Sequence, residues 1–111
     1  MIVLLLAAGM AGAPLDASMA QARREYGACL SRFMKTQETK KLDAAAYKAA
    51  ALTACTAQSD AFRQAWIAFD VSMKTKPSEA AEDAASQIQE YLDNSTENYE
   101  QSFVPAPAPH G

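Results

Sequence analysis

Apolar residues recur along residues 43–74 at steps of three, four or seven, which is the spacing of one helix face. This stripe consists of Tyr47, Ala51, Cys55, Phe62, Ala65, Trp66, Phe69 and Met73. Its phase is kept across Ser59 and Asp60, the one pair that could cap a new helix. The pattern therefore predicts a single amphipathic helix of about 30 residues, about 45 Å long, with Asp43 as its N-cap and Pro77 beyond its end.

Two further stripes flank this segment. From residue 21 to about residue 40, one helix face carries Tyr26, Cys29, Leu30, Phe33, Met34 and Gln37. After Ser78, a suitable N-cap, a third face carries Ala81, Ala84, Ala85, Ile88, Leu92, Ser95, Tyr99 and Phe103. With a short turn around residues 40–43, the expected fold is all-α: an antiparallel three-helix hairpin or bundle with a long central helix.

The two cysteines lie at equal distances from the first turn. Cys29 and Cys55 are each thirteen residues from Leu42, so they should meet across an antiparallel helix pair. We expect a structural disulfide, worth about 3 kcal/mol by the chain-entropy argument. The chain has no C-x-x-C motif that would favour redox activity or metal binding.

The first twenty residues have the pattern of a signal peptide. An apolar run covers residues 2–8, and Ser18 and Ala20 have the spacing that signal peptidase recognises. Cleavage is expected after Ala20, or alternatively after Ala22. The run is too short to span a bilayer, and Pro14 follows it, so no stable membrane span is expected after signal removal. No Lys or Arg precedes the run, which leaves the true start codon open; the alternative is a buried first helix.

These features divide the chain into a signal peptide (1–20), a single helical domain (21–103) and a disordered, Pro-rich tail (104–111). Alternating prolines in the tail favour an extended, polyproline-like segment with an exposed His110. The expected location is periplasmic or secreted. At 111 residues the chain has room for one small core.

Charge is divided unevenly along the chain. Residues 21–76 hold ten Lys and Arg against five acids, whereas residues from Pro77 onward hold seven acids and no Lys or Arg. We expect the acidic third helix to dock beside the basic first two. Export, an acidic pI near 5.0 and the lack of a basic run with interleaved aromatics argue against nucleic-acid binding.

No arrangement of residues in the sequence predicts catalysis. The single histidine lies in the tail, and the acids lie mostly on polar helix faces. We therefore expect no enzyme activity, no cofactor and no metal. The expected function is binding of an unknown protein, or a structural role in the cell envelope, by a small exported protein. A carrier of a small apolar ligand is another possibility, but it requires a cavity.

Residues 62–70, Phe-Arg-Gln-Ala-Trp-Ile-Ala-Phe-Asp, suggest a more specific alternative. They resemble the Gln/Arg-Ala-Trp-Ile-x-Phe-Arg-Asp helix of the LprI-like periplasmic proteins, which are small, helical, disulfide-bonded and associated with lysozyme inhibition. The likeness covers nine of 111 residues, and Val71-Ser72-Met73 stand where that family usually has a cysteine. The resemblance implies a periplasmic inhibitor of an envelope hydrolase.

The far end of the central segment is the predicted interaction surface. A first helix starting near Gln21 reaches only to about Arg63, and the opposing residues of the third helix are mostly alanines. The residues left with little cover are Trp66, Ile67, Phe69, Val71 and Met73. This end is expected to form a homodimer or bind a partner helix. The alternative is that splayed side chains and the C-terminal tail cover it.

Overall fold

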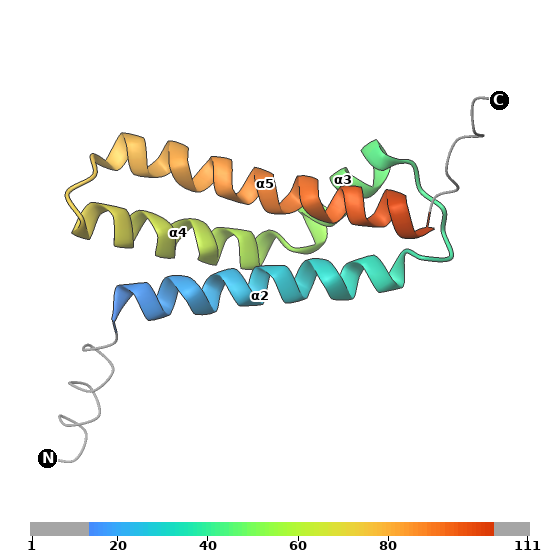
Figure 1. Cartoon of the computed structure of the whole chain (residues 1–111), viewed down its shortest axis with the longest axis horizontal. Coiled ribbons are helices and arrows are strands. Elements are labelled where there is room, and N and C mark those ends of the chain that lie inside the picture. The colour runs from blue at the N-terminus through green and yellow to red at the C-terminus, as the bar shows by residue number, and fades with distance from the viewer. Residues whose placement is uncertain (1–13, 104–111) are drawn as a thin grey trace, which may run out of the picture.

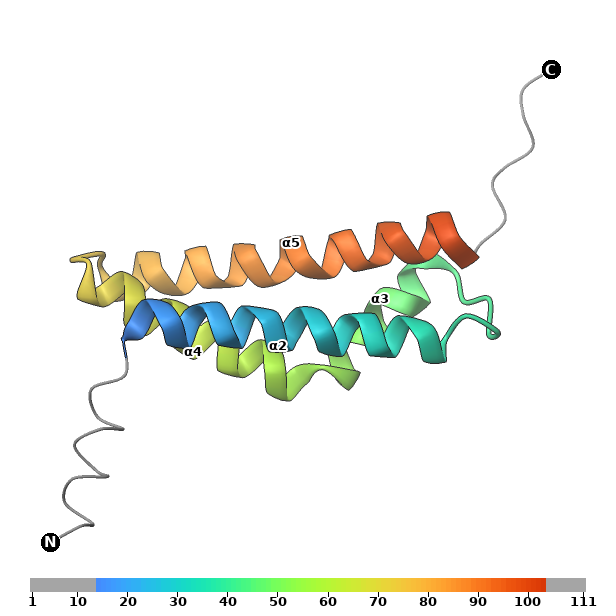
Figure 2. The same cartoon turned by 60° about the horizontal axis from the view of Figure 1, so that its bottom comes forward.

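The computed structural model describes residues 14–103. Its helices are α2 (Leu15–Thr36), α3 (Ala44–Ala54), α4 (Thr56–Ser72) and α5 (Pro77–Phe103). They contain 86% of these residues, and no strand occurs among them, which confirms the all-α prediction. The three longer helices lie side by side (Figures 1 and 2). Within residues 14–103, no helix is long and apolar enough to cross a membrane.

All four helices contribute to one core. Its fully buried aromatic residues are Tyr26 of α2, Tyr47 of α3, Phe62 of α4 and Tyr99 of α5. The first predicted stripe is buried or half-buried from Tyr47 to Phe69, whereas its last residue, Met73, is exposed. The third is shifted at its start, because Ala80 and Ala84 are buried and Ala81 and Ala85 are exposed.

A pair of stacked tyrosines holds the loop between α2 and α3. The rings of Tyr47 and Tyr99 lie 4.2 Å apart between centroids and are nearly parallel, at 6°. The Tyr99 hydroxyl donates to the carbonyl of Gln37 (3.1 Å) and accepts from the amide of Leu42 (2.9 Å). The end of α5 thereby fixes both ends of the loop.

The prediction of one long central helix is wrong. The helix is interrupted at Cys55, whose φ of −110° and ψ of 25° are not helical. Thr56 provides the physical reason, since its hydroxyl donates to the carbonyls of Leu52 (2.9 Å) and Thr53 (3.0 Å). Such bonds compete with the helical ladder and bend helices. As a result, α3 packs mainly on α5, whereas α4 packs on both α2 and α5.

The predicted disulfide between Cys29 and Cys55 is confirmed, with a Cα–Cα distance of 6.0 Å. It ties the middle of α2 to the junction of α3 and α4. Asp43 is also the N-cap of α3, as predicted, because its carboxylate accepts from the amide of Ala46 at 2.8 Å.

The acids of α5 lie on its outer side. All seven are exposed, and among residues 14–103 a single ion pair links two helices, that of Lys48 and Asp93 at 2.7 Å. Ion pairing between acidic α5 and the basic helices is therefore limited, among the described residues, to this one exposed pair, which contributes little to stability.

Candidate interaction surface

The five residues predicted to form the interaction surface lie on two sides of α4. At 100° per residue, Trp66, Phe69 and Met73 share the side of the buried Phe62, while Ile67 and Val71 lie on the opposite side. Trp66, Ile67 and Phe69 are half-buried, whereas Val71 is 41% and Met73 66% exposed. We call these sides the inner strip and the outer pair of α4.

Trp66 is held by its own helix. Its indole N–H donates to Oδ2 of Asp70 at 3.0 Å, and its ring meets Phe62 edge-on with centroids 6.0 Å apart. The indole also packs against the buried core. The ring is therefore held both by contacts within α4 and by the core that the four helices share.

The start of α2 also belongs to this end of the molecule, which the sequence analysis missed. α2 begins at Leu15, six residues before Gln21, the expected start. Met19 packs against the core. Leu15, Met19, Ala22 and Tyr26 have helical spacing, but the first two were assigned to the signal peptide. Within residues 14–103, the start of α2 therefore covers part of the C-terminal half of α4.

The alternative cover, the C-terminal tail, consists of residues 104–111, which lie outside the described part of the chain. The last described helix, α5, ends at the opposite end of the molecule from the end of α4 (Figure 1).

A groove of about 230 Å³ lies between α2 and α5. Its lining mixes apolar with polar side chains and consists of Gly27, Leu30, Ser31, Met34, Tyr91, Asn94, Ser95 and Asn98. Small-molecule sites usually exceed about 300 Å³ and are predominantly apolar. This groove therefore gives no support to a carrier of an apolar ligand.

Within residues 14–103, no group of three or more His, Cys, Asp or Glu side chains could hold a metal ion. The titratable groups in the core are tyrosines. Burial raises the pKa of Tyr26, against a smaller lowering by the Arg63 charge, and burial also raises the pKa of Tyr47. Both phenols are therefore neutral near pH 7 and poor proton acceptors there.

No family model, curated protein or solved structure matches the chain. The likeness of residues 62–70 to the LprI-like helix therefore rests on that segment alone.

Proposed function

We propose that this is a small exported protein that acts by binding another protein, or as a structural component of the cell envelope, without catalysis. The proposed scaffold is an antiparallel bundle of α2, α4 and α5, with α3 as a side branch. The disulfide between Cys29 and Cys55 supports export, because such bonds persist in oxidising compartments.

The exposure of apolar side chains at the end of α4 carries the proposal. Val71 (41%) and Met73 (66%) are two of the four large hydrophobic residues that are exposed within residues 14–103, and a third, Leu15 (43%), lies in the segment that the expected cleavage would remove. Apolar surface gathered at one end of a small protein typically marks an interaction site. The fourth, Leu52, is 48% exposed but lies on α3.

A pull-down tests the proposal. The tagged mature chain, bound to a support, should recover a defined partner from envelope extract, or a second copy of itself. Met73→Ser should weaken that recovery, whereas Leu52→Ser, at a similarly exposed residue on another helix, should not. Equal recovery with both variants, or no recovery at all, would contradict binding through this end.

The same experiment distinguishes plain binding from inhibition of an envelope hydrolase, the function that the resemblance of residues 62–70 implies. A recovered partner with cell-wall hydrolase activity is assayed for lysis with and without the mature chain. Loss of lysis that depends on Met73 would identify an inhibitor.

A further inference from the structure

The groove between α2 and α5 has a mostly apolar floor and a polar rim. The floor is buried or half-buried and is made by Gly27, Leu30, Met34, Tyr91 and Ser95. The rim is exposed and carries one hydroxyl and two amides, on Ser31, Asn94 and Asn98. Within residues 14–103, the hydrogen bonds of nearby α5 side chains involve Asp93, Ser95 and Thr96, and none involves a rim residue. The donors and acceptors of the rim are therefore available to a ligand.

Gly27 lies in the floor without a structural reason in the described part of the chain. In the interior of a helix, glycine costs about 1 kcal/mol relative to alanine. Its φ is not positive, and a Cβ added there would meet no heavy atom within 4 Å. Neither backbone conformation nor packing within residues 14–103 therefore requires glycine. Its bare Cα leaves open space in which a ligand can approach the helix backbone closely.

The ring of Tyr91 is held in place by the core. It stacks against Tyr26, with centroids 6.1 Å apart and planes at 23°, and it meets Phe62 edge-on with centroids 5.6 Å apart. Tyr91 is only half-buried, and it lines the groove. A ligand that packs on this ring meets a side chain whose orientation is already fixed, which lowers the entropy cost of binding.

The lining of the groove disfavours two classes of ligand. No charged side chain lines it, so an ionic ligand would lose hydration without gaining an opposite charge. An apolar ligand would cover the rim amides and leave them unpaired. The volume of about 230 Å³ also lies below the roughly 300 Å³ at which sites for drug-sized molecules begin. The chemistry that remains is a small uncharged ring with hydroxyls at its edge and C–H groups on its faces, which is a sugar.

We propose that the groove between α2 and α5 binds one uncharged sugar ring, alone or as a unit of a glycan chain. One C–H face of the sugar packs on Tyr91 and over the bare Cα of Gly27, because the negative face of an aromatic ring attracts weakly positive C–H groups. The hydroxyls of the sugar exchange hydrogen bonds with the rim residues, whose hydroxyl and amides both donate and accept. The groove is distinct from the end of α4, so this site and the proposed protein binding can fail independently.

Nuclear magnetic resonance of the full chain tests the site. Asn94 and Asn98 are the only two asparagines, so their side-chain amide signals report directly on the rim. Titration with N-acetylglucosamine should shift both signals and the backbone amide of Gly27. The trisaccharide of the same sugar should bind more tightly if the ligand is a glycan chain, and equally well if it is a single ring. Sorbitol, an open-chain polyol, should cause no shift. Absence of shifts with both sugars, or equal shifts with sorbitol, would overturn the proposal.

Two variants separate loss of the site from loss of the fold. Gly27→Ala fills the open space with a methyl group, so it should weaken sugar binding severalfold while raising the midpoint of thermal unfolding, because alanine favours the helix. Asn98→Ala should weaken binding about fivefold, the effect of losing one hydrogen bond. Gln89→Ala removes an exposed amide on another side of α5 and should leave binding unchanged. Unchanged affinity in both Gly27→Ala and Asn98→Ala would overturn the groove as the sugar site.

Discussion

Three tyrosines are fully buried, and their hydroxyl groups have different partners. That of Tyr47 bonds with the hydroxyl of Ser95 at 2.7 Å, and that of Tyr99 bonds with the backbone at both ends of the α2–α3 loop. The Tyr26 hydroxyl is buried and has no hydrogen-bond partner among residues 14–103. A buried, unpaired hydroxyl costs about 1–3 kcal/mol, so Tyr26 destabilises the fold through its oxygen while its ring stabilises it.

Replacing these tyrosines by phenylalanine should therefore change stability in opposite directions. Tyr26→Phe should raise the free energy of unfolding by about 1 kcal/mol, because it removes an unpaired polar group and keeps the ring. Tyr99→Phe should lower it by about 2 kcal/mol, because it leaves two backbone groups unpaired. Denaturant unfolding measures both. A loss of stability in Tyr26→Phe would show that this hydroxyl has a partner.

Stability should also fall at alkaline pH. Burial raises the pKa of Tyr26 and Tyr47 above the value near 10 of an unfolded chain, so the folded state binds more protons in that range. Their contribution is complete below about pH 10 and is lost as the pH rises through the folded-state pKa. Unfolding measured from pH 8 to 12 should show a shallower fall in the double variant Tyr26→Phe, Tyr47→Phe. Equal slopes would contradict this.

At the scale of the elements, periodicity predicted the faces of the helices but missed the break at Cys55. The steps from Ala51 to Cys55 to Ser59 keep helical phase, so a bend between them leaves no gap in the hydrophobic pattern. The available signal was the pair Thr53 and Thr56, whose hydroxyls bond back to carbonyls one turn earlier. Because threonine is also tolerated inside straight helices, this signal alone could not have predicted the break.

The sequence predicted only part of the arrangement at the candidate site, again because periodicity shows the sides of a helix but not its neighbours. The period of 3.6 residues already separates the inner strip from the outer pair of α4. It does not reveal which neighbour covers each side, since that depends on where α2 begins. At the start of α5, alanine occupies residues 80, 81, 84 and 85, so hydrophobicity could not indicate which of them are buried.

Loss of the disulfide should destabilise the protein substantially. Cys29 and Cys55 enclose a loop with a sequence separation of 26, for which the chain-entropy model gives about 3 kcal/mol. Cys29→Ser should lower the midpoint of thermal unfolding, and a reductant should lower that of the unmodified protein to the same temperature. A reductant should not affect the variant. Equal midpoints for reduced and oxidised protein would exclude a stabilising role.

The turn between α4 and α5 carries a strained residue. Lys74 has a φ of 72°, and the amides of Lys74 and Thr75 donate to the carbonyls of Val71 and Asp70, which is a Schellman motif with lysine in the place usually taken by glycine. Lys74→Gly should therefore raise stability by about 1 kcal/mol. Lys76→Gly, at a residue without positive φ, should not. Thermal unfolding compares them, and a destabilised Lys74→Gly would contradict the interpretation.

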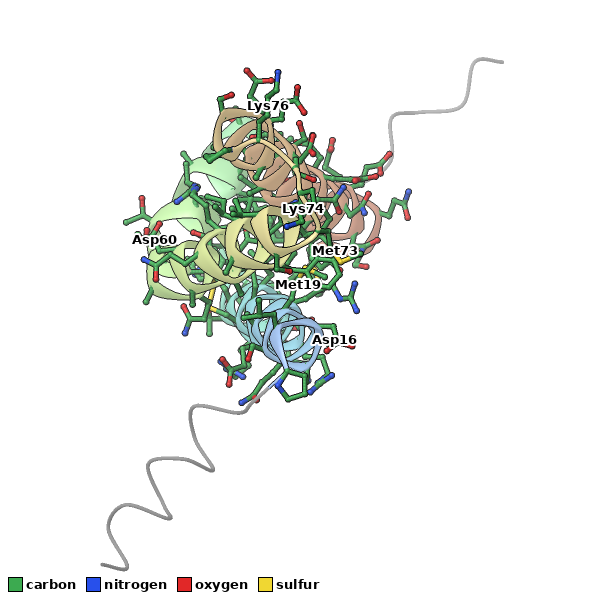
Figure 3. The ribbon with its side chains drawn as sticks, turned by 90° about the vertical axis from the view of Figure 1, so that its left-hand side faces the viewer. Asp16, Met19, Asp60, Met73, Lys74 and Lys76 are labelled. Carbon is green, nitrogen blue, oxygen red and sulfur yellow. A yellow bond between two sulfur atoms is a disulfide. The ribbon has the colours of Figure 1, made fainter. Side chains whose placement is uncertain are left out.

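At the scale of the whole molecule, different contacts hold the helices together at the two ends of the bundle. At one end the loop between α2 and α3 is bonded to Tyr99, the last buried residue of α5. At the other end, α4 and α5 meet at a short turn, and the first residues of α2 provide the third side (Figure 3). The structure of this second end therefore depends on where the mature chain begins.

This dependence allows a choice between the two expected cleavage sites. A chain beginning at Gln21 keeps the buried Ala22 and leaves one turn ahead of Tyr26, whereas a chain beginning at Arg23 loses Ala22 and brings Tyr26 into the first turn. The new α-ammonium group and Arg23 both oppose the helix dipole, so the first turn should fray and expose Tyr26 in the shorter chain.

The chain from Arg23 should therefore be less stable than the chain from Gln21, by about 1 kcal/mol for the lost alanine burial and the frayed turn. Intact-mass measurement of the exported protein should show a start at Gln21, allowing for the loss of ammonia if the terminal glutamine cyclises. A start at Arg23 would contradict the choice of site, and a mature protein that retains Met1 would contradict signal cleavage altogether. Denaturant unfolding of the two chains checks the physical reason separately from the cleavage, since equal stabilities would show that Ala22 and the first turn contribute nothing.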